Sequence, residues 1–139
     1  MEREVICGRV LVAGEASGES LVSPEPLSFW GGYDSDNGEI IDRRHPLSGQ
    51  IASGKILILP FTRGSSTTTA VLLESVKNGT APAGIITSRV DSFLSLASIV
   101  ADEMYQKPIP IVAVSPPELP RFKSGQKIEM ISDGTILIS

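Results

Sequence analysis

Cysteine and histidine are almost missing from this chain, which has one of each, Cys7 and His45, among 139 residues. A single thiol cannot form an internal disulfide. One thiol and one imidazole are also too small a ligand set for a structural zinc site or an iron-sulfur cluster. The chain is therefore predicted to hold no metal unaided.

Clustered basic residues and long apolar runs are missing as well. The formal charge is −4, and no run of Lys and Arg occurs. Nucleic acids and acidic membranes need clustered positive charge, so both are disfavoured as partners. No stretch approaches the length of a membrane span, and the charged start MEREVICGRV lacks the apolar core of a signal peptide. We therefore expect a cytoplasmic protein.

The composition that remains is that of an ordinary globular protein. Hydrophobic residues make up 41% of the chain and charged residues 20%. A chain of 139 residues is long enough to bury a core and has the size of one domain. We expect residues 1–139 to form a single domain.

The most informative stretch is GKILILPFTRGSSTTTAVLLE, residues 54–74. Its apolar run over 56–59 predicts a strand covered on both faces, and the Gly/Ser/Thr turn after Pro60 leads into a predicted helix. A helix that begins at such a turn presents free N–H groups and the positive end of its dipole, which suits an anion. The turn is the first candidate for a site.

A structural interpretation of the same turn is equally open at this stage. Serine and threonine are ordinary helix N-cap residues, so the cluster could serve only to satisfy free N–H groups. The turn is not a Walker A loop, a dinucleotide-binding fingerprint or a nucleophile elbow, because the lysine or the further glycines of those motifs are missing.

Before this stretch, the pattern predicts strands. In residues 4–13, Val5, Cys7, Val10 and Val12 stand among alternating neighbours, which predicts a strand with one face buried and makes Cys7 a small core residue rather than a reactive thiol. Residues 14–18 are predicted to form a loop and residues 19–22 a second short strand.

After the turn, helices and strands are predicted to alternate. We expect a helix over 66–78 ended by Gly79, a strand over 83–87, a helix capped by Asp91 or Ser92, and a strand over 109–114. The second helix has apolar residues at spacings of three and four that predict a core-facing stripe: Phe93, Leu96, Ala97, Val100 and Met104. Residues 127–139 are predicted to form a hairpin with an Asp133-Gly134 turn. The fold class is thus α/β, with parallel strands, two main helices and a C-terminal β-hairpin in a mixed sheet.

A long irregular segment, residues 24–50, carries the lone Trp and the lone His. Such a segment in a compact domain is either mobile or functional. Asp34 to Gly38 resembles the start of a calcium loop, but the required glutamate is missing, so an Asn-Gly turn is favoured. Trp30 is a core anchor or an interface residue, and His45 is by default a hydrogen-bonding residue that holds a loop.

Four stretches together resemble the small subunit, or swivel domain, of the aconitase X family. They are LVSPEPLSFWGGYD at 21–34, GEIIDRRHPLSGQ at 38–50, GKILILPFTRGSS at 54–66 and DSFLSLASIVADEMYQKPIPIVAV at 91–114. The resemblance implies a swivelling β/β/α fold that closes over a large subunit, to form a heterodimer in which the large subunit carries a [4Fe-4S] cluster. It tilts Trp30, with Gly31 and Gly32, toward the interface and places His45 beside a possible cleft.

The resemblance also implies residue roles in an elimination of water. In aconitase-like enzymes the open iron of the cluster acts as Lewis acid while a serine of a Gly-Ser-Ser turn removes a proton. The matching serine is Ser65, with Arg63 and the N–H groups of Gly64 and Ser66 placed to hold an anionic substrate. The chain departs from the family pattern at 61–62 and 67–69, which weakens Thr67 and Thr68 as contacts more than Ser65.

Two substrates are implied within the family. Archaeal two-subunit members dehydrate (R)-5-phosphomevalonate to trans-anhydromevalonate 5-phosphate in a modified mevalonate pathway of isoprenoid biosynthesis, and many bacterial members dehydrate cis-3-hydroxy-L-proline. A separate short chain resembles the archaeal arrangement, which favours phosphomevalonate. A non-catalytic anion-binding or structural module is the alternative from another class.

Overall fold

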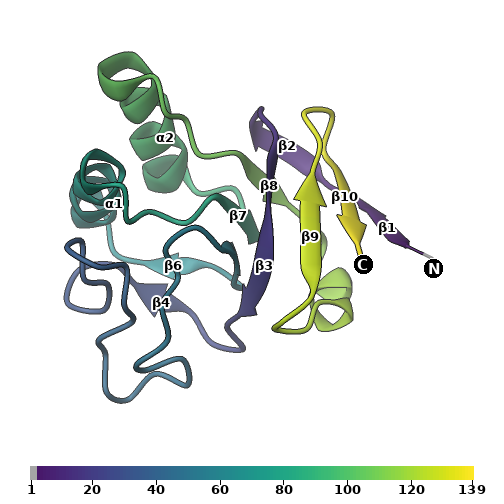
Figure 1. Cartoon of the computed structure of the whole chain (residues 1–139), viewed down its shortest axis with the longest axis horizontal. Helices are drawn as coiled ribbons and strands as arrows, with labels where there is room; N and C mark the ends of the chain where they lie inside the picture. The colour runs from purple at the N-terminus through teal and green to yellow at the C-terminus, as the bar shows by residue number, and fades with distance from the viewer. Residues whose placement is uncertain (1–2) are drawn as a thin grey trace.

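Four parallel strands form the centre of the molecule. The computed structural model describes residues 3–139. The parallel strands, in spatial order, are β3 (Ala16–Val22), β5 (Ile56–Ile58), β7 (Gly84–Thr87) and β8 (Ile111–Ala113). Helices α1 (Ser66–Asn78) and α2 (Ser92–Tyr105) pack against each other on one side of these strands (Figure 1). Both turns that lead into the helices therefore lie at the carboxyl end of the parallel strands.

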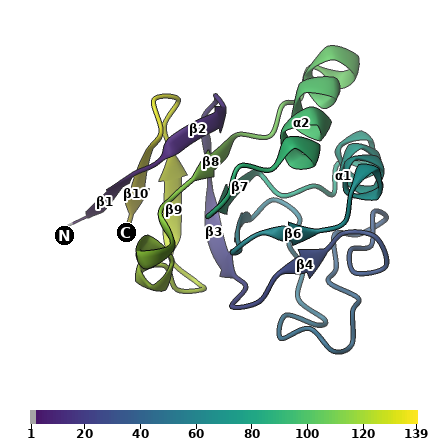
Figure 2. The same ribbon diagram turned by 180° about the vertical axis from the view of Figure 1, so that it is seen from behind.

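Antiparallel strands on the other side complete an eight-stranded, barrel-like sheet. They are β9 (Lys127–Met130), β10 (Thr135–Ile138), β1 (Glu4–Cys7) and β2 (Arg9–Val12), in the order β1-β10-β9-β3-β5-β7-β8-β2. Strands β1 and β2 are joined only by Gly8, so one chain segment connects the two edges of the sheet (Figure 2). A Cβ atom at Gly8 would lie 2.3 Å from Val112 Cγ1, which leaves room only for glycine at this junction.

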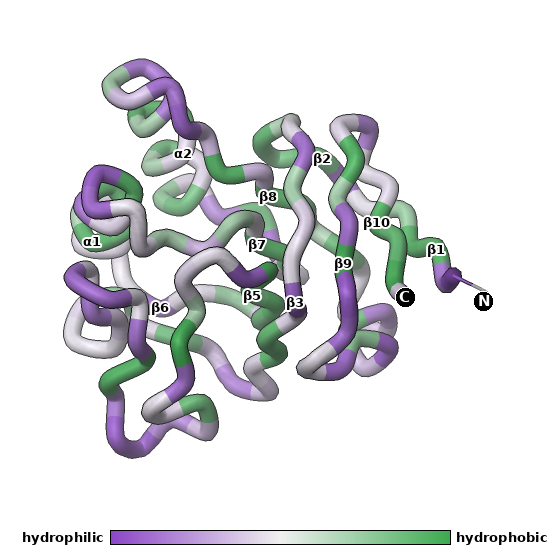
Figure 3. The backbone as a smooth tube through the Cα atoms, viewed as in Figure 1, coloured by the Kyte–Doolittle hydropathy of each residue, from purple (hydrophilic) through white to green (hydrophobic). Residues whose placement is uncertain are grey.

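The core has two layers, separated by the parallel strands. Alternate residues of β5 face opposite sides: Leu57 packs with the helices and with Leu72 and Leu94, whereas Ile56 and Ile58 pack with the antiparallel strands. Hydrophobic residues dominate β8 and β10, and both helices are mixed (Figure 3). The layers are thus helix, parallel strands and antiparallel strands, as in a β/β/α domain.

The predicted fold class is confirmed, including the mixed sheet, the two main helices and the C-terminal hairpin. Helix α1 spans the predicted residues and ends at Gly79, whose φ of 73° is left-handed. Asp91 caps α2 by accepting hydrogen bonds from the N–H groups of Phe93 and Leu94. In the hairpin turn, hydrogen bonds from Thr135 lower the pKa of Asp133. A 3-10 helix, η1 (Pro116–Arg121), was not predicted.

The prediction for the N-terminal strand named the wrong residues as buried in its first part. Ile6 is the buried residue of β1, whereas Val5 and Cys7 are exposed. The alternation was read as one strand, but the chain bends at Gly8 and forms two strands. Cys7 is therefore not a core residue. The predicted loop over 14–18 was also too long, because β3 begins at Ala16 to pair with β9.

The predicted core stripe of α2 was largely wrong as well. The buried residues of the helix are Leu94, Ala97, Ser98 and Ala101. Phe93, Leu96 and Met104 are exposed, as is Ile99. Periodicity identified an apolar face correctly, but a second, smaller face of Leu, Ala and Ser contacts the sheet. Most of the apolar stripe is left without a partner within residues 3–139.

The irregular segment is built into the core rather than loose. Phe29, Tyr33, Ile40 and Leu47 are all buried in the helix-side cluster. Residues 34–38 form a turn in which Gly38 N–H donates to Asp34 O at 2.7 Å and Asp36 N–H to Asp34 Oδ1 at 2.8 Å. Among residues 3–139, no helix has the length and apolar character needed to cross a bilayer.

Tyr33 fastens this segment to the end of α1, and it provides a test of the fold. Its hydroxyl donates to Thr80 O at 2.7 Å, and burial raises the pKa of the phenol above its ordinary value. The unfolded chain loses this proton above about pH 10, while the folded chain keeps it. The contribution of Tyr33 to the free energy of unfolding is therefore fully present below about pH 10 and decreases as the pH rises above it.

We expect Tyr33→Phe to lower the free energy of unfolding by about 1 kcal/mol at pH 7, the usual contribution of one hydrogen bond. Between pH 9 and 11 the variant should lose less stability than the wild type. Urea unfolding across this range measures both effects. Parallel pH profiles for the two proteins would contradict the assignment.

Candidate active site

The predicted site lies where two turns are brought side by side. The short strands β4 (Leu27–Ser28) and β6 (Thr62–Arg63) pair in parallel, with Ser28 opposite Arg63. The residues that follow each strand, 29–32 and 64–65, therefore leave this pair at the same end (Figure 1). Neither strand was predicted, because two residues are too few to show a periodicity.

Ser65 occupies the N-cap position of α1, but its side chain does not act as a cap. Its φ and ψ are −143° and −132°, and its hydroxyl makes no capping hydrogen bond. A capping Ser65 hydroxyl would accept a hydrogen bond from the N–H of Thr68. That N–H donates instead to the backbone oxygen of Ser65, at 2.9 Å. The Ser65 residue is exposed. Its hydroxyl is thus free to contact a ligand.

The neighbours of Ser65 give the turn a positive character. Arg63 and Ser66 are exposed, and no salt bridge found among residues 3–139 involves Arg63. The first turn of α1 contains no acidic residue, so nothing within it offsets the positive end of the helix dipole. Gly64 has φ of 123°, a conformation that residues with a side chain rarely adopt. The four predicted residues are contiguous and open to solvent.

A pocket of about 280 Å³ adjoins this turn and was not predicted. It lies between the β6 turn and the start of α2, and its lining residues are Phe61, Thr62, Gly64, Arg89, Val90, Asp91, Ser92 and Phe93. Gly64 is the member of the predicted set that lines it.

Arg89 is the charged residue of the pocket that the sequence reasoning missed. Its guanidinium carbon lies 3.9 Å above the ring centroid of Phe61, which holds the cation in place. Asp91, the acid in the same pocket, is engaged by the Thr62 hydroxyl and by two N–H groups of α2. The sequence did contain a signal for Arg89, because it stands in a turn between a predicted strand and a predicted helix. The turns that lead from parallel strands into helices all lie at the carboxyl end of those strands, so Arg89 could have been expected near Gly64.

Trp30 is exposed, with 67% of its surface accessible, while the preceding Phe29 is fully buried. The structure therefore gives the core position to Phe29. Gly31, with φ of 76°, is open on the side where a side chain would project. Gly32 is buried, and a Cβ atom there would lie 2.2 Å from Ser28 O. These glycines let the chain turn sharply after β4, with Trp30 exposed in the turn.

His45 is buried and ties two segments together. Its Nδ1 accepts a hydrogen bond from Leu47 N–H at 3.0 Å, so the proton of the neutral ring is on Nε2, which lies 3.1 Å from Ser23 Oγ. The Ser23 hydroxyl in turn donates to Glu25 O. None of these bonds involves residues 63–66. The geometry is that of a residue that holds the irregular segment to the end of β3.

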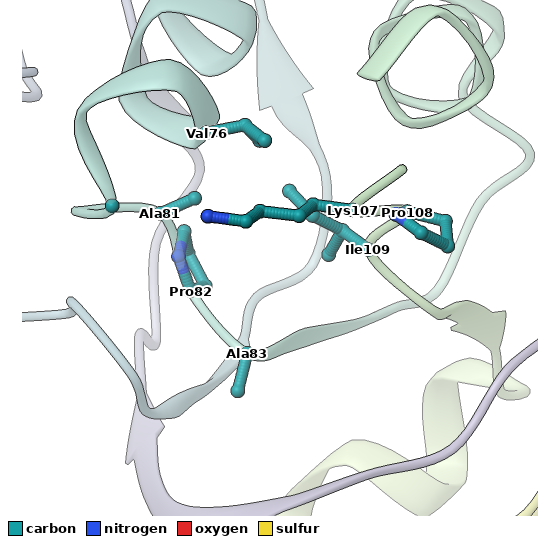
Figure 4. Close-up of a pocket in the computed structure, with 8 residues that line it drawn as sticks. Val76, Ala81, Pro82, Ala83, Lys107, Pro108 and Ile109 are labelled. Atoms are coloured by element: carbon teal, nitrogen blue, oxygen red, sulfur yellow. The ribbon is translucent and has the colours of Figure 1, made fainter. Parts of the chain in front are cut away.

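A second pocket, of about 190 Å³, lies at the amino-terminal end of the parallel strands, opposite the Ser65 turn (Figure 4). It is formed where α1 ends and where β7 and β8 begin, by small apolar residues and the stem of Lys107. Ligands of open α/β sheets bind at the carboxyl ends of the strands, where Ser65 lies. This rule favours the Ser65 turn over this pocket as the candidate site.

The described chain does not offer a ligand set for an iron-sulfur cluster. No three His, Cys, Asp or Glu side chains come together within residues 3–139. Cys7 lies on β1, in the antiparallel layer, away from the carboxyl end of β5. A cluster needs several thiolates, so its ligands would have to come from another chain or segment.

A layered β/β/α domain with an exposed Gly-Ser-Ser turn at the carboxyl end of its parallel strands defines the swivel class. The family model described as "Aconitase X swivel domain" matches residues 5–138. The chain belongs to the aconitase X family, as its swivel domain.

Known proteins of this family are similar over most of the chain. The phosphomevalonate dehydratase small subunit of Thermococcus onnurineus is 35% identical over 91% of this chain and 91% of that protein. The cis-3-hydroxy-L-proline dehydratase of Pseudomonas aeruginosa is 48% identical over 79% of this chain, which corresponds to only 19% of that protein. The chain thus spans about a fifth of the length of that relative. A crystal structure of Thermococcus kodakaraensis aconitase X, in its holo-form, has a TM-score of 0.87 and 33% identity, with 98% of each chain covered.

The two hydrogen bonds of His45 can be separated by substitution. His45→Asn keeps an acceptor for Leu47 N–H and loses the bond to Ser23, whereas His45→Ala loses both. We expect losses of about 1 and 2 kcal/mol of unfolding free energy, respectively, measured by urea titration. If the chain acts in a dehydratase, as the relatives above do, His45→Asn should leave turnover unchanged. A variant that assembles with unchanged stability yet has no turnover would give His45 a catalytic role instead.

Proposed function

We propose that this chain is the small subunit of a hydro-lyase that dehydrates (R)-5-phosphomevalonate to trans-anhydromevalonate 5-phosphate, with Ser65 as proton acceptor. The relatives reported above are dehydratases of two substrates, so elimination of water is the reaction that they share. The observation that carries the proposal is the Ser65 hydroxyl, which sits at a helix N-terminus, exposed and not used as a cap.

Elimination of water needs a base at the carbon next to the one that bears the hydroxyl. In the proposed step deprotonated Ser65 Oγ accepts a proton from that carbon, the C–H electron pair forms the double bond, and the C–O bond breaks with its electron pair on the departing oxygen. That hydroxide takes up one proton to leave as water, and loss of one proton from Ser65 restores the base. A serine oxygen is a weak base in water, so it must be deprotonated in a closed, positively polarised site. Arg63 and the N-terminus of α1 supply positive charge beside it.

The charges around the turn favour phosphomevalonate over hydroxyproline. Phosphomevalonate carries a phosphate and a carboxylate, whereas hydroxyproline carries one carboxylate and an ammonium group. Arg63 precedes Gly64 in the chain, Arg89 lines the same pocket as Gly64, and the acid of that pocket, Asp91, is already engaged by three donors. This part of the site therefore offers partners for anionic groups and no free carboxylate for an ammonium group.

Hydroxyproline dehydration is the second candidate function. The Pseudomonas aeruginosa relative has the higher identity of the two reported relatives, 48% against 35%. Assays of the assembled enzyme on both substrates decide between them. A protein that dehydrates neither, and that needs no partner to bind anions, would instead be the anion-binding or structural module.

A large subunit is the proposed partner, and it would hold the [4Fe-4S] cluster for which this chain lacks ligands. When bound, such a cluster would act as the Lewis acid for the departing hydroxyl. The relative from Thermococcus onnurineus is named a small subunit, which implies a larger partner. Trp30 follows β4, the strand that pairs with β6, and Phe93 of the α2 stripe lines the pocket that Gly64 also lines; both are exposed, and a partner that completes the site would contact them.

Ser65→Ala tests the catalytic assignment in enzyme reconstituted with the large subunit. We expect kcat to fall by about a hundred to ten thousand fold with KM little changed, because a general base acts on the chemical step. Ser66→Ala is the control: it keeps the backbone N–H through which Ser66 is proposed to hold the substrate, so both kcat and KM should change little. A Ser65→Ala enzyme that keeps more than about a tenth of its kcat would refute the role of Ser65. A loss of about 1 kcal/mol of stability without loss of turnover would indicate a cap instead.

Trp30→Ala tests the interface. Exposed tryptophans at protein interfaces often contribute about 2 kcal/mol or more to binding, so affinity for the large subunit should fall at least tenfold. The melting temperature of the isolated chain should stay the same, because Trp30 is exposed. Val5→Ala is the matched control, since Val5 is exposed on β1 and should leave assembly unaffected. Lower stability with unchanged affinity would overturn the interface assignment.

A further inference from the structure

Thr68, in the first turn of α1, has a buried hydroxyl without a partner. The residue is 1% exposed, and within the described part of the chain its Oγ1 is the buried side-chain atom that makes no hydrogen bond. A buried hydroxyl in this state is unfavourable, because it has given up its bonds to water and gained none. A threonine in a helix can bond to the carbonyl four residues earlier, but this one does not. The orphaned hydroxyl therefore needs an explanation.

The hydroxyl is directed toward Gly64 and the N-terminus of the helix. A Cβ atom at Gly64 would lie 3.0 Å from Thr68 Oγ1 and 3.5 Å from Thr67 Oγ1, so both hydroxyls face the side of Gly64 that lacks a side chain. The N–H groups of Ser66 and Thr67 belong to the first turn and have no acceptor within the helix. The first turn of α1 thus holds the unpaired N–H groups of Ser66 and Thr67 together with two hydroxyls, of Thr67 and Thr68, that face Gly64.

We propose that Thr68 binds an oxoanion, the phosphate or carboxylate of the substrate, by donating its hydroxyl hydrogen to it. This inference rests on the proposed function and extends its binding site by one residue. The anion docks on the N–H groups of Ser66 and Thr67, and the Thr68 hydroxyl supplies a further bond at the inner side. The hydroxyl that is orphaned without ligand then has a charged acceptor, which makes the bond a strong one.

Gly64 permits this approach. Thr68 Oγ1 is closed to solvent in the unliganded turn, so the Gly64 peptide must shift for the anion to reach it. Glycine has the widest range of backbone angles, and Gly64 already has φ of 123°. With no side chain between the ligand and the threonine, a small rotation of the turn opens the way.

Thr68→Val is the test, because valine has the shape of threonine without the hydroxyl. The first measurement is a titration of the ¹⁵N-labelled chain with inorganic phosphate and, separately, with acetate, followed by amide chemical shifts. We expect the amides of Gly64, Ser66 and Thr67 to shift in the wild type, and the affinity to fall about tenfold or more in Thr68→Val, as for loss of a charged hydrogen bond. Thr68→Ser keeps the hydroxyl and should keep the affinity.

The second measurement is thermal stability without anion. Thr68→Val should raise the melting temperature by about 3 °C, since it removes an unsatisfied buried hydroxyl. Thr69→Val is the matched control on the same helix. The Thr69 hydroxyl donates to Phe93 O at 2.9 Å, so its loss should lower the melting temperature and leave anion binding alone.

The outcomes separate this inference from the proposed function. Binding is measured without turnover, so a chain that binds phosphate through Thr68 but forms no active dehydratase supports the inference alone. Tighter phosphate binding would indicate the phosphate group as the bound part of the substrate, and equal or tighter acetate binding the carboxylate. Absence of amide shifts in the wild type, or equal affinity in Thr68→Val, would overturn the inference.

Discussion

The burial of β5 on both faces is the constraint on which the rest of the structure depends. Ile56, Leu57 and Ile58 are fully buried, with β3 and β7 paired on either side. A central strand of this kind cannot shift its register without exposing one of the two cores. The chain that leaves it at Pro60 is therefore delivered to one fixed place. The positions of Arg63 to Ser66 follow from this strand and not from contacts of their own, which are few.

Because the buried strand fixes the position of the exposed turn that follows it, the residues of the turn can serve binding or catalysis without having to stabilise the fold. Ser65 stands where a capping hydroxyl would stabilise α1, and it forgoes that bond. Thr68, one turn later, has a hydroxyl without a partner. At the start of α2, by contrast, Asp91 makes the full set of capping bonds. The two helices of one domain thus begin in opposite ways, and the incomplete start belongs to the helix that carries the predicted site.

The sequence predicted the elements whose signals are local. The end of α1 at Gly79, the cap at Asp91 and the Asp133-Gly134 hairpin were correct, because each depends on one or two residues with special backbone or hydrogen-bonding chemistry. The predictions that failed depended on which strands lie next to each other in space, which a local sequence pattern does not show. Whether Cys7 or Ile6 points inward depends on how β1 pairs with β10, and Arg89 reaches the site only because β7 lies beside β5.

The error on α2 has the same origin and carries functional meaning. Its strongest apolar stripe was assigned to the core because a folded chain usually buries such a stripe against itself. Here the sheet takes the smaller face of Leu, Ala and Ser, Phe93 stays exposed in the lining of the pocket that Gly64 also lines, and Leu96 is exposed further along the helix. A chain that evolved alone would gain stability by the opposite choice. An exposed apolar surface next to a candidate site is expected when a second protein completes that site, because the second protein would bury the apolar surface on binding.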